Sequence, residues 1–151
     1  DVIASLVRDR LKGQLNVIVS TDHDFLQLVT YTDQLLVPKV GTRPEAIYDP
    51  DRVVNEYGVP PEKMVHLRAL LGDTSDNLPG VPKFPSKLLT SLLRAHGSVE
   101  GIFSSSLAGT TKAQYDRLKA AESQVKLNVE LMGLQQVPYD LTEPTPDFDL
   151  A

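Results

Sequence analysis

Two acidic pairs in this sequence have the residue types and the spacing to bind a hard metal ion. Asp22 and Asp24 lie two residues apart, directly after the apolar segment Leu15 to Ser20. Two carboxylates at such a turn can both reach one cation, and α/β folds place their sites at the ends of parallel strands. Asp73 and Asp76 lie three residues apart in a Gly-Asp-Thr-Ser-Asp-Asn motif. At that spacing both side chains can lie on one side of a tight loop.

Four carboxylates in two clusters suit a phosphodiesterase that works with two divalent ions. Mg²⁺ prefers oxygen ligands, and two ions about 4 Å apart can activate the attacking water and stabilise the leaving oxygen. Each pair also has a purely structural interpretation. Asp22 could cap the helix that follows it, and the second motif could be a turn that binds its own backbone. The chain has no cysteine, which excludes thiolate metal sites.

The elements expected around these carboxylates begin with a small α/β part. Apolar spacing predicts a helix over residues 2–12, and the β-branched run Leu15 to Ser20 predicts a strand buried on both faces. A short helix over 21–29, a strand over 35–40 and a weaker strand over 43–47 follow. Parallel sheets usually contain more strands, so the pattern indicates strands that this chain does not supply.

A helical part follows from residue 49 onward. Helices are predicted over 50–57, 61–71, 86–96 with Ser86 as its cap, 98–103 and 110–132. The last helix is expected to bury one stripe of side chains: Leu118, Ala121, Val125, Val129 and Met132. The chain is thus divided into residues 1–48, the C-terminal part of an α/β core, residues 49–140, a helical subdomain, and residues 141–151, an acidic tail containing proline.

Charge and hydropathy exclude some classes of protein. The net charge of -5 argues mildly against binding DNA by bulk positive charge, although bound divalent cations would reverse the local sign. No apolar run approaches the ~20 residues of a membrane span. The histidines are interpreted as structural or solvent-facing, including His23 between the first two carboxylates.

The segments around the four aspartates resemble the 5′-nuclease family, the metal-dependent DNA-cutting domains of bacterial DNA polymerase I and of flap endonucleases. Segment 20–29 (STDHDFLQLV) resembles the family's strand running into Asp-x-Asp and a Gln-Leu pair, and 57–62 (YGVPPE) resembles its helix junction. Segment 70–81 (LLGDTSDNLPGV) is close to the family signature of Gly-Asp, two variable positions, Asp-Asn, an aliphatic residue and Pro-Gly-Val. Residues 1–4 resemble the end of a Glu-Ala-Asp-Asp motif, so the resemblance runs from residue 1 to about residue 140.

The resemblance implies a partial parallel-sheet nuclease core of the PIN/5′-nuclease type, followed by a DNA-binding helix-three-turn-helix subdomain. It implies hydrolysis of DNA phosphodiesters at 5′ ends and flaps with two Mg²⁺ or Mn²⁺ ions. Asp22, Asp24 and Asp76 would be catalytic metal ligands, Asp73 a ligand or a neighbour of one, and Asp1 a weaker metal ligand.

The resemblance also has implications for partners. Implied partners are DNA with 5′ ends or flaps, and either a covalently attached polymerase domain or the missing N-terminal nuclease half, without a membrane. The implied location is the cytoplasm or nucleoid, or a viral or organellar DNA compartment. Taken alone, the chain would lack half of the metal site and would be inactive.

The family's helix-three-turn-helix contains a Gly-x-Gly turn that approaches a duplex phosphate and often binds K⁺. In this chain Lys83-Phe84-Pro85 stands at that turn, so both glycines are replaced and the proline removes an amide donor. The sequence therefore argues against the K⁺ site, although Lys83 can supply a point charge. Lys87 and Arg94 are seven residues apart on one helical face and are predicted to bind phosphates.

Two alternatives remain open from the sequence. A haloacid-dehalogenase-type phosphatase also has a strand running into Asp-x-Asp and a later Gly-Asp motif, but its usual spacing between the later acids is one residue longer than here. A nuclease relative that only binds DNA or a protein would explain the altered turn. Phosphatase activity without DNA cleavage would identify the first, and missing upstream acids would identify the second.

Overall fold

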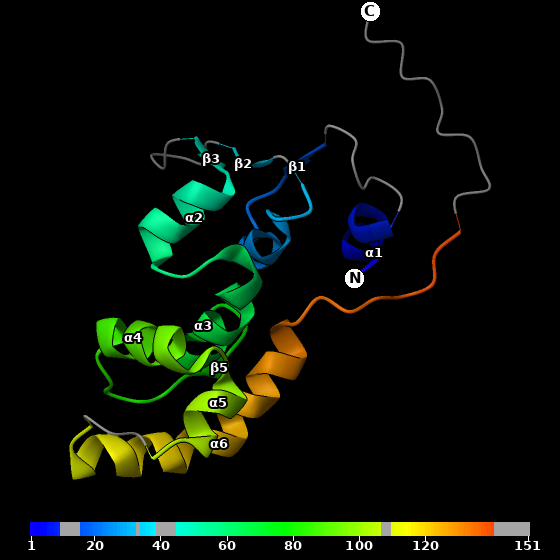
Figure 1. Ribbon diagram of the computed structural model, residues 1–151. Helices are drawn as coiled ribbons and strands as arrows, with labels where there is room; N and C mark the ends of the chain where they lie inside the picture. Colours follow the sequence, from blue (N-terminus) through cyan, green and yellow to red (C-terminus); the bar gives the residue numbers. More distant parts are fainter. Residues whose placement is uncertain (10–15, 33, 39–44, 107–109, 141–151) are drawn as a thin grey trace, which may run out of the picture.

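The computed structural model describes residues 1–9, 16–32, 34–38, 45–106 and 110–140. A small sheet and helix α1 (Val2–Asp9) lie at one end of the molecule, and a group of helices forms the other end (Figure 1). The hydrophobic core continues from the sheet into the last helix, so both parts pack as one unit. The mixed α/β fold expected from the sequence is therefore confirmed. The acidic tail predicted over residues 141–151 lies outside the described residues.

The sheet has three short strands in the order β1-β2-β3. Strand β1 (Val17–Val19) pairs in parallel with β2 (Gln34–Val37), with Ile18 opposite Leu35. Strand β3 (Ala46–Tyr48) pairs antiparallel with β2, which makes the sheet mixed. The weak third strand predicted over 43–47 is therefore observed as β3, and residues 43 and 44 of the predicted range lie outside the described residues.

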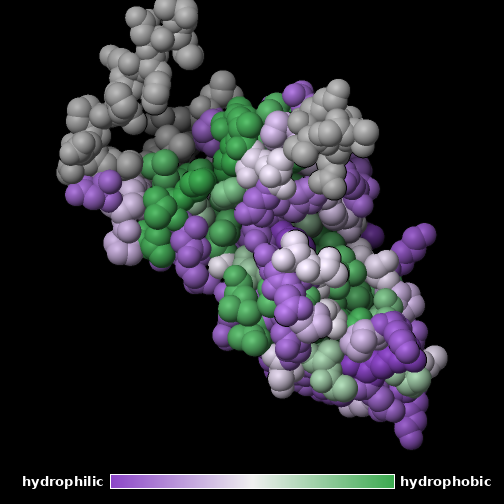
Figure 2. Space-filling model, turned by 180° about the vertical axis from the view of Figure 1, so that it is seen from behind, coloured by the Kyte–Doolittle hydropathy of each residue, from purple (hydrophilic) through white to green (hydrophobic). Residues whose placement is uncertain are grey.

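Strand β1 differs from its prediction because it is not buried on both faces. Val17 and Val19 expose 48% and 64% of their surface, whereas Leu35 of β2 is fully buried. Seen from behind, hydrophobic surface gathers over α1 and β1 (Figure 2). The residues that the structure describes supply no strand on the outer side of β1. The β-branched run was read correctly as a strand, but the cover it was expected to have is not supplied by those residues.

The helical part begins with helix α2 (Pro50–Tyr57), which has the predicted bounds. Asp49 caps its first turn by accepting a hydrogen bond from the Arg52 amide, and Gly58 ends it in the left-handed region with φ of 76°. The predicted helix over 61–71 consists of a 3₁₀ turn, η2 (Pro61–Lys63), followed by α3 (Met64–Leu71). Proline at the start of η2 suits a first turn, where its missing N–H costs nothing.

Three further helices complete the fold: α4 (Ser86–His96), α5 (Val99–Ser104) and α6 (Lys112–Met132). The predicted cap at Ser86 is wrong, since Pro85 occupies the N-cap position and no side chain caps α4. Helix α6 begins with a capping box formed by Thr111 and Gln114, which explains why it starts two residues later than predicted. None of the helices in the described ranges is long and apolar enough to cross a bilayer.

A tight hairpin joins α3 to α4 and carries the second acidic motif. Its strands are β4 (Gly72–Asp73) and β5 (Leu78–Pro79), paired antiparallel. A Cβ on Gly72 would collide with the backbone of Gly80, and a Cβ on Gly80 would collide with that of Leu71. Gly72 also has φ of 81°, a region that disfavours other residues. The two glycines therefore let the hairpin return directly onto the end of α3.

Candidate metal and DNA-binding site

The first acidic pair lies where β1 runs into the 3₁₀ helix η1 (His23–Leu28). Asp22 is the N-cap of η1, and its Oδ1 accepts a hydrogen bond of 2.8 Å from the Asp24 amide. The Asp22 amide in turn donates to Ser20 Oγ at 3.1 Å. The capping interpretation of Asp22 is therefore correct, and capping engages one of its two carboxylate oxygens. A cap and a metal ligand are compatible roles for this side chain.

The second acidic pair lies on the β4–β5 hairpin. Asp73 Oδ1 accepts hydrogen bonds from the Ser75 amide at 2.8 Å and from the Ser75 hydroxyl. These bonds, led by the hydroxyl and helped by Arg68, lower the pKa of Asp73 to about 2 although burial opposes them. Asp76 is exposed in the turn of the hairpin. Asp73 is therefore a fixed, ionised carboxylate, and Asp76 is accessible from solvent.

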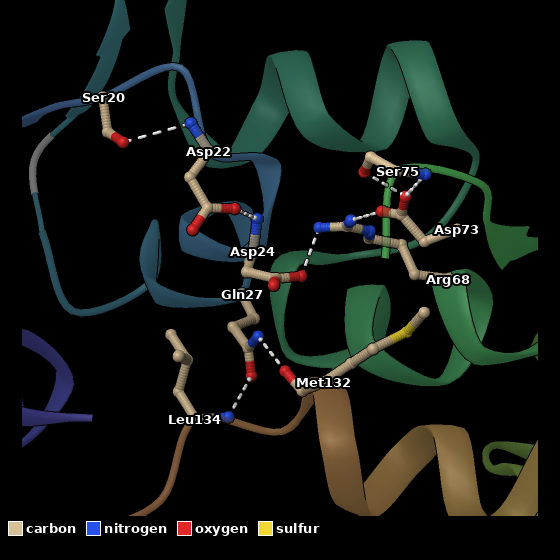
Figure 3. A network of polar contacts seen from close by, with 9 residues as sticks. All are labelled: Ser20, Asp22, Asp24, Gln27, Arg68, Asp73, Ser75, Met132 and Leu134. Carbon is tan, nitrogen blue, oxygen red and sulfur yellow. Dashed lines mark hydrogen bonds and ion pairs between the residues drawn. The ribbon is translucent and has the colours of Figure 1, made fainter. Parts of the chain in front are cut away.

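Arg68 of α3 joins the two acidic pairs (Figure 3). Its Nη1 donates to Asp24 Oδ1 and its Nη2 donates to Asp73 Oδ2, so one guanidinium bridges carboxylates 49 residues apart in sequence. The Arg68 side chain is 16% exposed, which makes this a shielded ion pair on both sides. The bridge holds η1 and the hairpin at a fixed separation.

All four aspartates of the two motifs line one pocket of about 520 Å³, termed here the acidic pocket. Its walls come from the loop after β1, from η1, α2 and α3, and from the hairpin. Burial is the largest cause that raises the pKa of Asp24, Arg68 acts against it, and the charges of Asp22, Asp76 and Asp73 raise it further. Asp24 therefore lies within the electrostatic reach of the other three carboxylates, as the sequence predicts for a shared site.

The acidic pocket has the donor chemistry of a magnesium or manganese site. Its carboxylates are hard oxygen donors, and a divalent cation would relieve the repulsion among them, which adds to burial in raising the pKa of Asp24. Over the described ranges, however, no three acidic or histidine side chains are close enough to enclose one ion. The four aspartates thus fit a divalent cation in type, as a partial set of ligands.

Asp1 is not brought to this pocket. Its Oδ1 accepts a hydrogen bond of 2.8 Å from the Gln135 amide, and its backbone carbonyl caps α1 through Ser5. The segment after α6 holds α1 in the same way through Val137, whose amide donates to Ser5 Oγ at 2.8 Å. Within the described residues Asp1 therefore anchors the two ends of the structure together and does not line the acidic pocket.

Lys87 and Arg94 line a second groove of about 420 Å³ along α4, termed here the α4 groove. Both side chains belong to exposed residues, and the seven-residue spacing places them on the same face as predicted. The α4 groove shares Tyr57, Leu67 and Leu71 with the acidic pocket, so the two hollows adjoin. A continuous surface therefore leads from the four carboxylates to the two basic side chains.

Lys83 lies in the turn before α4 with φ of 50°, in the left-handed region. Its carbonyl accepts a hydrogen bond of 2.8 Å from Arg117 Nη1 of α6. A glycine would adopt this conformation without the cost of roughly 1 kcal/mol that a side chain incurs. The turn therefore has a backbone shape at Lys83 that suits glycine, and the hydrogen bond from Arg117 holds it in place.

Three residues other than the four aspartates position the site. Arg68 is one, and the other two, Gln27 and Asn128, have buried side-chain amides. Gln27 of η1 donates to the Met132 carbonyl at 3.0 Å and accepts from the Leu134 amide at 3.2 Å (Figure 3). Asn128 of α6 donates to the Ala69 carbonyl at 3.1 Å and the Pro79 carbonyl at 2.9 Å. Helix α6 thereby holds both acidic elements.

A signal for Asn128 was present in the sequence, because a polar residue on the apolar stripe of a helix is usually satisfied by a specific partner. The predicted stripe includes Val129, which is only partly buried, and omits Asn128, which is fully buried. Gln27 belongs to the Gln-Leu pair of the first motif, but nothing in the sequence indicates its distant partners.

Comparison with known proteins agrees with this arrangement. A family model described as 5′-3′ exonuclease, C-terminal SAM fold, matches residues 59–148. DNA polymerase I of Bacillus subtilis is 31% identical over 132 residues, which cover 87% of this chain and 15% of that protein. A 5′-3′ exonuclease of Buchnera aphidicola is 36% identical over 104 residues, covering 68% of this chain and 35% of that protein. The chain thus spans about a third or less of these relatives.

Solved structures share the fold at lower identity. A mutant of the T5 5′-exonuclease superposes with a TM-score of 0.68 at 24% identity, over 86% of this chain and 53% of that one. The catalytic core of Rad2 in complex with DNA substrate gives a TM-score of 0.54 at 15% identity, over 94% of this chain and 49% of that one. With the family model covering more than half of its residues, the chain belongs to the 5′-3′ exonuclease family and carries that family's C-terminal SAM fold.

Proposed function

We propose that this chain is the C-terminal part of a divalent-metal-dependent 5′-3′ exonuclease or flap endonuclease that hydrolyses DNA. The observation that carries the proposal is the convergence of four aspartates, from two motifs far apart in sequence, in one pocket. The family membership and the adjoining basic groove support it. Residues 1–48 supply the acidic turn after β1, and residues 49–140 supply the hairpin and the DNA-binding helices.

The proposed roles follow from what each carboxylate contacts. Asp22, Asp24 and Asp76 would hold the Mg²⁺ or Mn²⁺ ions, which supply an activated water and stabilise the departing 3′ oxygen. Asp73 has hydrogen bonds to both of its oxygens, from Ser75 and from Arg68. Asp73 would therefore contribute to metal binding and catalysis indirectly, by holding Arg68 and by shaping the hairpin. No role in the pocket is proposed for Asp1.

The DNA would lie along the surface that joins the acidic pocket to the α4 groove. Lys87 and Arg94 would bind phosphates of the duplex there, and Lys83 would add a point charge at the preceding turn. Potassium is not part of this proposal, because the turn lacks the glycines and the amide that such a site uses.

The remaining ligands and a cover for β1 are proposed to come from an N-terminal nuclease half. Fewer than a full set of ligands is present in the described residues, and the outer edge of β1 exposes Val17 and Val19. Additional strands there would bury these side chains and bring further strand-end acids to the pocket. A covalently attached polymerase domain, as in several relatives, is a further proposed partner.

The test is cleavage of a labelled DNA duplex with a 5′ flap by the full-length protein. Mg²⁺ or Mn²⁺ should support release of the flap or of nucleotides from the 5′ end, and a chelator should stop it. A small phosphomonoester should remain intact. Hydrolysis of the phosphomonoester without DNA cleavage would identify a phosphatase, and DNA binding without cleavage would identify a relative that only binds.

The α4 groove can be tested separately from cleavage. Lys87→Ala should weaken binding to duplex DNA and reduce the slope of log affinity against log salt by about one unit, because one phosphate contact is lost. Fluorescence anisotropy over a salt series measures both quantities. Lys126→Ala is the matched control, since Lys126 pairs with Glu122 outside the groove. An unchanged slope for Lys87→Ala would show that this residue binds no phosphate.

A further inference from the structure

We propose that Arg68 is an internal counter-ion that competes with the metal ions of the acidic pocket. Its guanidinium bridges Asp24 and Asp73 and neutralises part of the cluster, and this contact must loosen on the Asp24 side when a divalent cation binds. The inference rests on the proposed metal-dependent function and adds to it a residue that lowers the affinity of the site for metal.

The position of Arg68 makes this competition unavoidable. The side chain extends from α3 into the acidic pocket, and one of its two hydrogen bonds goes to Asp24, a proposed ligand (Figure 3). The guanidinium donates to Asp24 and Asp73 at once, so it offsets the same carboxylate charge that a metal ion in the pocket would offset. Two cations that relieve one cluster of charge bind it less tightly together than either does alone.

The hydrogen bond to Asp73 explains why the guanidinium would lose its contact with Asp24 and keep its contact with the hairpin. Asp73 accepts hydrogen bonds from Ser75 on one oxygen and from Arg68 on the other, so Ser75 holds it in place as a partner for Arg68. Release from Asp24 would leave one edge of a guanidinium, still tethered to the hairpin, facing the pocket. A planar fork of donors at that point is suited to an oxygen of the DNA phosphate that enters the same pocket.

The competition can be measured as metal affinity, without reference to cleavage. Mn²⁺ is titrated into the full-length protein by calorimetry at neutral pH, for the parent, Arg68→Gln and Arg68→Lys. Arg68→Gln should bind Mn²⁺ about tenfold more tightly, because a unit positive charge beside the ligands is removed. Arg68→Lys keeps that charge and should stay within about threefold of the parent. Arg52→Gln removes the same charge from α2, outside the pocket, and should leave the affinity unchanged.

The outcomes separate this inference from the proposed function. Weaker or unchanged Mn²⁺ binding by Arg68→Gln, with normal binding by the parent, would overturn the counter-ion role and leave the nuclease proposal intact. Absence of Mn²⁺ binding by the parent would overturn both. Circular dichroism of each variant identifies misfolding. If Arg68→Gln does not fold, Arg68→Lys alone tests the proposal, and an affinity of Arg68→Lys for Mn²⁺ at least tenfold higher than that of the parent would contradict it.

Discussion

Asp22→Asn and Asp76→Ala, each in the full-length protein, are expected to reduce DNA cleavage by about 10³-fold or more. Losing one carboxylate ligand removes several kcal/mol of stabilisation from a metal-assisted transition state, and each 1.4 kcal/mol is about a factor of ten in rate. DNA binding should persist within a few-fold, because Lys87 and Arg94 lie in the α4 groove and not in the acidic pocket. Single-turnover cleavage of a 5′-flap duplex and anisotropy with uncleaved DNA measure the two effects.

Asparagine is the informative replacement at Asp22, because that residue has two functions. Asn caps a helix about as well as Asp, so Asp22→Asn should preserve the hydrogen bond to the Asp24 amide while removing the charge. Asp49→Asn is the matched control, since Asp49 caps α2 through the Arg52 amide and does not line the acidic pocket. Full cleavage by both Asp22→Asn and Asp76→Ala would mean that these carboxylates are structural and not ligands.

Asn128→Ala is expected to lower the free energy of unfolding by about 3 kcal/mol. The fully buried amide donates to the Ala69 and Pro79 carbonyls, and its removal leaves both acceptors without this partner beside a new cavity. Ala69 precedes the β4–β5 hairpin and Pro79 closes it, so the substitution should also loosen the loop that carries Asp73 and Asp76. Urea denaturation of the parent and the variant gives the difference directly.

A second substitution separates the hydrogen bonds of Asn128 from its volume. Asn128→Asp keeps the shape, removes both N–H donors and introduces a buried charge, so it should destabilise the fold at least as much as Asn128→Ala. Asn55→Ala on the exposed face of α2 should change the free energy of unfolding by less than about 0.5 kcal/mol. If Asn128→Asp were as stable as the parent, the amide would not be what holds α6 to the hairpin.

Elements with local signals were predicted best. The bounds of α2 and α4 were correct because proline or glycine marks their ends, and such signals act within a few residues. The start of η1 was close to its prediction, but the short 3₁₀ geometry was not foreseen. Strand β1 was recognised from its β-branched residues, whereas its exposure depends on neighbours that a local pattern cannot specify.

The sequence predicts the chemistry of the candidate site but not the residues that hold its carboxylates in position. Both acidic motifs were found because carboxylates at short spacing are recognisable within one segment. Arg68, Gln27 and Asn128 were missed because each acts on a distant part of the chain: Gln27 contacts a carbonyl 105 residues away, and Asn128 one that is 59 residues away. The sequence marks Asn128 as a polar residue on an apolar stripe, but a local pattern does not identify partners this far away in the chain.

The open outer edge of β1 has a practical consequence for work with this chain in isolation. Among the described residues β1 is an edge strand with exposed valines, and strands of other molecules can pair with such an edge. Neither a charge nor a proline lies within Val17–Val19 to discourage this pairing. Expressed alone, the polypeptide would tend to self-associate and to enter inclusion bodies. A lysine at Val19, which is 64% exposed, is the simplest gatekeeper to introduce before attempting purification.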